Sequence, residues 1–141
     1  MKKITDNNKL HYELTDAECE QMLQLAETTL ANTFPTSGSG YAAVVMNADG
    51  KLYEGASYGS DTYTLTMHGE MVALAHAATH GAREIVAITG PNCHICKQLI
   101  YESSLRSGID IVVVMKEESG FKQVPISTIM PYPWPAEPFL K

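Results

Sequence analysis

Residues 68–79 read HGEMVALAHAAT, and this stretch decides the fold. Its residues are apolar almost all the way round a helix, and Gly81 follows as the kind of glycine that ends many helices. A helix with so little polar surface must be covered on most sides by other elements. The segment therefore predicts a buried central helix.

Five short runs rich in apolar and β-branched residues surround this helix and are typical of strands: 41–46, 51–56, 84–89, 109–115 and 121–124. Asp49-Gly50 is a hairpin signal between the first two, and residues 117–120 form a turn between the last two. A second helix is predicted over 93–104, with Asn92 as its cap. Strand, helix and strand in this order favour parallel neighbours joined by a right-handed crossover. We expect an α/β protein, a three-layer α/β/α fold around a mixed five-stranded sheet.

The two ends of the chain carry different signals. Thr15 and Glu18 form a capping box, and apolar residues then recur at helical spacing until the chain reaches Pro35, which predicts an amphipathic first helix. Residues 131–141 are too rich in proline for regular structure. Because chains of roughly 100–200 residues usually form one domain, we expect a single domain over 1–141 with a proline-rich tail at 131–141.

Composition and charge narrow the classes of partner. The 141 residues are 45% hydrophobic and 18% charged, with a formal net charge of -6, three cysteines, and no apolar run suited to a signal peptide or a membrane span. An acidic chain repels phosphates, so we expect a small-molecule partner and neither nucleic acid nor membrane. Because an odd cysteine count fits reduced thiols better than a disulfide framework, we expect a cytoplasmic location.

Four side chains at the starts of the two predicted helices carry the chemistry. His68 begins the first helix, and Cys93 and Cys96 lie three residues apart at the start of the second. A catalytic zinc takes three protein ligands and keeps a fourth position for water, and helix N-termini stabilise thiolates. Glu70 follows His68 by two residues, which places it near the metal without ligating it. The spacing predicts one zinc ion per chain.

The chain resembles the cytidine deaminase family over about residues 41–134. GASYGSDTYTLTMHGE, from Gly55 to Glu70, is similar to the family pattern GCNVENASYGLTxCAE, and CHICKQLIYE, from Cys93, is similar to CGxCRQVLxE. ISTIMPYPW, at 126–134, resembles the family's ELLPxxF segment. HxE followed by CxxC is also the signature of zinc deaminases. The resemblance implies the cytidine deaminase fold, a zinc site at His68, Cys93 and Cys96, and hydrolysis of a cytosine-type nucleoside or analogue to the uracil form with release of ammonia, as in pyrimidine salvage.

The resemblance also implies roles for individual residues and an assembly. Glu70 matches the carboxylate that moves protons, and Trp134 matches an aromatic residue that stacks on the pyrimidine across a subunit interface. Small family members are usually homotetramers, so we expect a homotetramer, or alternatively a homodimer. Many members have a third cysteine in place of His68 and an Arg after the glutamate. Met71 follows here, and with a neutral histidine no compensating Arg is needed.

Several positions depart from the family pattern and concern the substrate. The ribose-binding Asn and Glu correspond to Ser57 and Gly59, and a Phe that packs on the base corresponds to Ser39. Tyr58 stands beside the missing Glu, as in blasticidin S deaminases, so a blasticidin S-like or other non-nucleoside amine is the alternative substrate. Ser57, Tyr58 and Trp134 are the predicted substrate contacts. One extra residue also separates Pro91 from Cys93, and His94 replaces a glycine.

Two other classes of function compete with an enzyme acting on small molecules. A CxxC pair alone is typical of redox or structural-zinc sites, which would make the chain a non-catalytic zinc-stabilised binding module. Glu70 argues against this, because a structural site is closed by a fourth ligand and needs no free carboxylate. Deaminases of transfer RNA or nucleotides share the motifs, but the acidic charge disfavours them.

Overall fold

The computed structural model describes residues 1–36 and 40–140, so Ser39 lies outside the described residues. The strands are β1 (Lys2–Asp6), β2 (Lys9–Glu13), β3 (Ala42–Asn47), β4 (Leu52–Ala56), β5 (Ile85–Thr89), β6 (Val112–Glu117) and β7 (Gly120–Pro125). The helices are α1 (Asp16–Thr29), α2 (Gly69–Thr79) and α3 (His94–Ser107), with 3-10 turns at Leu30–Asn32, Tyr63–Leu65 and Ile126–Ile129. In the described part of the chain, no helix is both long enough and apolar enough to cross a membrane.

Five of the strands form the predicted mixed sheet, in the order β4-β3-β5-β6-β7. Strands β5 and β6 are parallel, and the other neighbours are antiparallel. The parallel pair is the one joined through α3, as the strand, helix, strand order predicts. The sequence-based boundaries differ from those of the structure by up to three residues.

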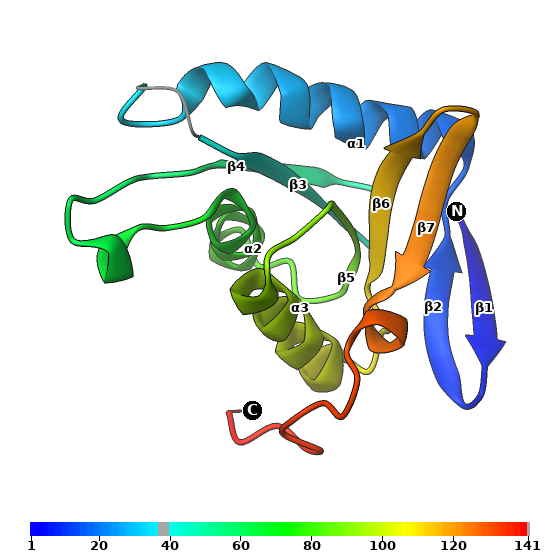
Figure 1. Ribbon diagram of the computed structural model, residues 1–141. Helices are drawn as coiled ribbons and strands as arrows, with labels where there is room; N and C mark the ends of the chain where they lie inside the picture. The colour runs from blue at the N-terminus through cyan, green and yellow to red at the C-terminus, as the bar shows by residue number, and fades with distance from the viewer. Residues whose placement is uncertain (37–39, 141) are drawn as a thin grey trace.

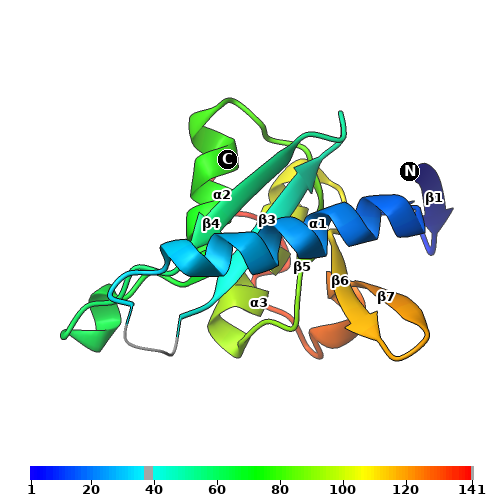
Figure 2. The same cartoon turned by 90° about the horizontal axis from the view of Figure 1, so that it is seen from above.

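Helices cover both faces of this sheet. Helix α1 crosses one face, and α2 and α3 lie together on the other (Figure 1); the view from above shows the same separation (Figure 2). Strand β3 explains why both faces need cover: Val44 and Met46 join the core under α1, whereas Ala43 and Val45 join the core under α2 and α3. Side chains of a strand alternate between faces, so a fully apolar strand requires three layers.

Helix α1 begins with the predicted capping box. The Thr15 hydroxyl accepts from the Glu18 backbone N–H, and the Glu18 carboxylate accepts from the Thr15 backbone N–H at 2.8 Å. Cys19 and Met22 on its inner face are fully buried, so both belong to the core under this helix.

The N-terminal hairpin β1–β2 is absent from the sequence-based assignment. Its turn residues Asn7 and Asn8 have φ of 48° and 61°, the left-handed region that asparagine tolerates better than most residues. The hairpin joins the body of the protein through Leu10, whose carbonyl accepts from the Asp110 N–H at 2.7 Å. Alternation is weak in this segment because most of its side chains are exposed.

Two glycines set how closely α2 approaches the sheet. A Cβ on Gly55 of β4 would lie 2.2 Å from the Ala73 nitrogen, and a Cβ on Gly69 would lie 2.7 Å from the Tyr41 carbonyl oxygen. Only residues without a side chain fit such contacts between backbones. They fix the start of α2, and with it the position of His68.

Candidate metal centre and active site

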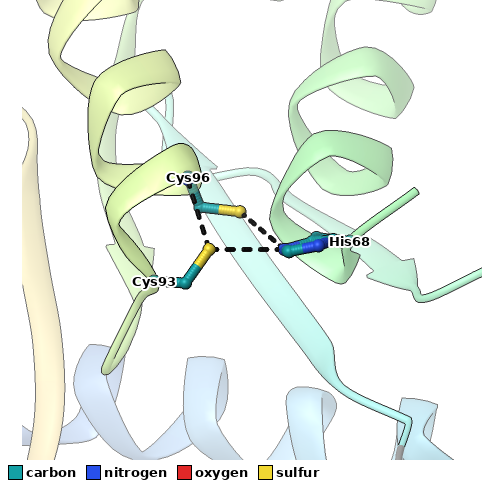
Figure 3. Close-up of side chains that lie close together, drawn as sticks. All are labelled: His68, Cys93 and Cys96. Atoms are coloured by element: carbon teal, nitrogen blue, oxygen red, sulfur yellow. Dashed lines mark hydrogen bonds between the residues drawn. The ribbon is translucent and has the colours of Figure 1, made fainter. Parts of the chain in front are cut away.

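The N-termini of α2 and α3 lie next to each other, and each begins at a side chain that can ligate zinc. His68 is the N-cap of α2 and Cys93 is the N-cap of α3, both with extended backbone. Figure 3 shows Cys93 and Cys96 of α3 directed at His68 across the gap between the two helices. The sequence-based prediction that Asn92 caps α3 is wrong: the cap is Cys93, whose sulfur accepts from the Cys96 N–H.

The distances among these three side chains fit a tetrahedral zinc. His68 Nδ1 lies 3.4 Å from Cys93 Sγ and 3.3 Å from Cys96 Sγ, and the three ligand atoms all lie within 4.8 Å of one another. With Zn–S of about 2.3 Å and Zn–N of about 2.0–2.1 Å, tetrahedral angles place nitrogen and sulfur about 3.5 Å apart. The separations are therefore those of ligands that share one ion.

The electrostatics of the cluster also favour a cation. Cys96 is fully buried, and burial together with the nearby Glu70 carboxylate raises the pKa of its thiol. Cys93 adds a second sulfur beside it. A positive ion at this point would compensate two thiolates and a carboxylate, whose negative charge exceeds the partial positive charge of the two helix N-termini.

Glu70 is a buried carboxylate with one free oxygen. It is 2% exposed, and its Oε1 accepts from Asn92 Nδ2 at 3.0 Å. Its Oε2 has no hydrogen-bond partner among the described residues. A buried carboxylate oxygen without a partner is unfavourable, so this oxygen is available to a group that the protein itself does not supply.

The cluster opens into a cavity of about 510 Å³. His68, Glu70 and Cys93 lie in its wall, and Ser57, Asp61 and Tyr63 are among the other lining residues. The volume falls within the range of small-molecule sites. The arrangement therefore places two of the three metal ligands, together with a carboxylate that has an unpaired oxygen, in the wall of one cavity of ligand size.

Comparison with known proteins identifies the family. The model of the family described as "Cytidine and deoxycytidylate deaminase zinc-binding region" matches residues 16–115, which is more than half of the chain. The chain belongs to this deaminase family. The match includes all three proposed zinc ligands and Glu70, and it makes zinc the expected cofactor of the cluster.

One curated relative is a cytidine deaminase of Sodalis glossinidius (strain morsitans). It is 32% identical over 109 residues, which are 74% of this chain and 34% of that protein. The chain thus spans about a third of the length of that relative. Its name therefore supports membership of the deaminase family rather than the activity of this chain.

Solved structures of cytidine deaminases have the same fold. The enzyme from Burkholderia pseudomallei aligns with a TM-score of 0.69 at 20% identity, over 82% of this chain and 98% of that one. The Mycobacterium tuberculosis enzyme aligns with a TM-score of 0.70 at 16% identity, over 82% and 96%, and the Mycobacterium leprae enzyme with 0.64 at 19%, over 79% and 96%. These likenesses confirm the predicted α/β deaminase fold.

The three predicted substrate contacts of this deaminase family member lie in different places. Ser57 lines the cavity, and its hydroxyl accepts from the Tyr41 backbone N–H at 3.1 Å. Tyr58 packs on the Phe34 ring at 5.3 Å and is not among the lining residues. Trp134 is 67% exposed, lies outside the cavity of its own chain and packs on Phe139 at 5.4 Å. Only Ser57 therefore borders the cavity within one chain.

Two residues of the deaminase site escaped the sequence analysis. The Tyr41 hydroxyl donates to the Pro91 carbonyl at 2.8 Å, and burial, with the charges of Glu70 and Cys96, raises the pKa of Tyr41 to about 12. Asn92 donates to Glu70. The only sequence signal for Asn92 is that it is the extra residue between Pro91 and Cys93. Tyr41 gives no such signal, because an aromatic residue at the start of an apolar strand is typical of a core.

Proposed function

We propose that this chain is a zinc-dependent hydrolytic deaminase that converts a cytosine-type nucleoside or analogue to its uracil form. His68, Cys93 and Cys96 hold one zinc ion per chain, and Glu70 moves the protons. The observation that carries the proposal is the unpaired, buried Oε2 of Glu70, a residue that shares one cavity wall with His68 and Cys93 of the converging ligand cluster.

Zinc in such a site makes hydroxide available from water near neutral pH. The protein's own residues then have to move protons and hold the pyrimidine ring of the substrate. Glu70 takes a proton from the attacking water and gives it to the ring nitrogen beside the amine-bearing carbon. It then takes the second proton from the new hydroxyl group on that carbon and gives it to the amine as the C–N bond breaks, so that the carbon becomes a carbonyl and ammonia leaves. A carboxylate that is buried but unpaired on one oxygen suits this role.

The charges of the cavity favour an unphosphorylated substrate. Asp61 and Glu70 are both in its wall, and none of the described lining residues is Lys or Arg. A phosphate would face like charges and gain no cation. We therefore propose a nucleoside rather than a nucleotide.

Ser57 has a short side chain and Gly59 has none, so the sugar receives few contacts from this chain. A blasticidin S-like amine is the alternative substrate.

Trp134 would contact the substrate only in the cavity of a second copy of the chain. Gln98 Nε2 donates to the Trp134 carbonyl at 2.7 Å, and the Tyr101 hydroxyl donates to the Pro135 carbonyl at 2.9 Å, so the tail is anchored on α3 while the indole stays exposed. An exposed indole on an anchored backbone is well suited to stack on a base in a neighbouring subunit. We propose a homotetramer, or alternatively a homodimer.

Ammonia release tests this function. Zinc-loaded protein is assayed with cytidine, deoxycytidine, deoxycytidylate and blasticidin S, and Glu70→Gln is compared with Glu102→Gln, a carboxylate on α3 that is hydrogen-bonded only to Gln98 among the described residues. We expect activity on a nucleoside, loss of at least about 100-fold in Glu70→Gln and little change in Glu102→Gln. Zinc bound with no ammonia from any of the four substrates would leave the non-catalytic zinc module as the function.

A further inference from the structure

Asn92 holds the Glu70 carboxylate by one oxygen only. Its Nδ2 donates to Glu70 Oε1 at 3.0 Å and to the Thr89 carbonyl at 3.0 Å. Asn92 is 8% exposed and Glu70 is 2% exposed, so water competes little for this bond. The contact links the carboxylate at the start of α2 to the loop between β5 and α3 that leads into Cys93.

The Thr89 carbonyl fixes which way the amide faces. A carbonyl oxygen can only accept, so the NH₂ group of Asn92 and not its oxygen must point at it. One amide hydrogen then goes to Thr89 and the other to Glu70 Oε1. Because an amide nitrogen cannot accept a hydrogen bond, a proton on Oε1 would find no partner there. Oε1 is therefore kept as an acceptor, and a proton on this carboxylate belongs on Oε2.

The amide is placed for the site rather than for stability. Asn92 Oδ1 is buried and has no hydrogen-bond partner among the described residues. A buried polar atom left unpaired lowers stability. Natural proteins keep such departures from complete pairing at functional sites.

We infer that Asn92 is a positioning residue that orients Glu70 and confines its proton transfers to Oε2, an inference that rests on the proposed deaminase function. Without this donor the Glu70 side chain, near the start of α2, is free to turn and to be protonated on either oxygen. Asn92 is the extra residue between Pro91 and Cys93 noted above, so the family pattern has no counterpart of it.

The kinetic test compares three variants with zinc content measured in each. Asn92→Ala removes the donor, Asn92→Leu removes it at nearly constant size and adds no charge, and Ser104→Ala is the control. Ser104 is a buried side chain further along α3 that accepts from the Ile111 N–H at 3.0 Å. We expect both Asn92 variants to keep one zinc per chain and KM within about threefold, while kcat falls about 10–100-fold, the usual effect of losing such a supporting contact. Ser104→Ala should lose stability but keep kcat.

Three results would overturn the inference: an unchanged kcat in both Asn92 variants, loss of zinc in both, or an equal fall of kcat in Ser104→Ala. A crystal structure gives a readout that does not depend on activity. Zinc-loaded wild type should show one Glu70 rotamer with Oε1 on Asn92, and Asn92→Ala should show more than one. If the wild type releases no ammonia, the proposed function fails, but the comparison of rotamers still tests whether Asn92 orients Glu70. A single unchanged Glu70 rotamer in Asn92→Ala would overturn the orienting role of Asn92.

Discussion

His68 and Cys93 occupy the same position in two different helices: each is the N-cap residue, and their side chains face each other with Nδ1 and Sγ 3.4 Å apart. Both helix starts therefore lie at one point, where the partial positive charge of their N-termini offsets part of the repulsion between two sulfurs and the Glu70 carboxylate. Burial and the Glu70 charge nevertheless raise the pKa of the Cys96 thiol, and a bound cation would offset this. The metal site is thus built from two helix ends that the sheet holds side by side.

Comparing the loss of Cys96 with the loss of Cys19 should distinguish the effect of losing zinc from the effect of losing core packing. Cys96 and Cys19 are both fully buried, so Cys96→Ala and Cys19→Ala lose similar packing, about 1 kcal/mol each. We expect Cys96→Ala to lose its zinc as well, and its melting temperature to become insensitive to a chelator. Cys19→Ala should keep one zinc per chain and remain sensitive. Metal analysis and thermal unfolding with and without chelator check this, and equal zinc content in the two variants would contradict it.

A side chain at Gly55 should disturb the metal site through α2. Its Cβ would lie 2.2 Å from a backbone nitrogen of the helix. We expect Gly55→Ala to lower the free energy of unfolding by about 3 kcal/mol or more and to reduce zinc occupancy, because His68 begins the same helix. Gly81→Ala is the control: φ is +82° with nothing within 4 Å of the added Cβ, so we expect a loss of about 1–2 kcal/mol with zinc retained. Urea unfolding and metal analysis distinguish the two.

Stability should depend on pH through Glu18. Burial alone would raise the pKa of this carboxyl, but the hydrogen bonds from the Thr15 backbone and hydroxyl and the Met1 ammonium together hold the pKa below its ordinary 4.5. Because the folded pKa is the lower one, the contribution is fully present above about pH 4.5 and is lost as the pH falls through the folded value. Glu18→Gln keeps a capping-box side chain without the charge.

We therefore expect Glu18→Gln to be about 0.5 kcal/mol less stable than wild type at pH 7, with a difference that shrinks as the pH falls below 4.5. Glu20→Gln is the matched control on the same helix, since among the described residues Glu20 accepts only from the Gln24 side chain. Its difference from wild type should stay small throughout. A Glu18→Gln difference that persists unchanged at pH 3 would show that charge is not its cause. Urea titrations at several pH values measure this.

The negative charge of Asp61 should weaken the use of phosphorylated substrates. It lines the cavity and is exposed, and a charge at its mouth repels a phosphate by about 1 kcal/mol. We expect Asp61→Asn to raise kcat/KM for deoxycytidylate relative to deoxycytidine about two- to fivefold. Asp49→Asn, in the turn between β3 and β4, should leave the ratio unchanged. The ratio from the two substrates measured side by side checks this, and an unchanged ratio in Asp61→Asn would contradict it.

The elements that bury apolar surface could be predicted from the sequence. The helix after His68, the strands around Asp49-Gly50 and the capping box at Thr15 all agree with the structure, because periodicity, turn residues and caps are local signals. The β1–β2 hairpin could not, since exposed side chains leave no alternation to read. The spacing HxE and CxxC also identified the three converging side chains, because ligand spacing on helices is local too.

Contacts between distant segments could not be read from the sequence. Asn92 looked like a helix cap, because asparagine before a helix usually is one. Its side chain instead reaches Glu70, 22 residues away in the sequence, and the cysteine after it caps the helix. The place of Trp134 is equally non-local: hydrogen bonds from α3 fix its backbone outside its own cavity.

X-ray absorption at the zinc edge of the purified protein tests the central claim most directly. We predict one zinc per chain with two sulfurs at about 2.3 Å, one imidazole nitrogen at about 2.0–2.1 Å and a single light donor from solvent. The Cys96→Ala protein should lose this signal. A zinc with four protein donors, or a shell without two sulfurs and one imidazole, would contradict the claim that His68, Cys93 and Cys96 hold an open zinc site beside Glu70.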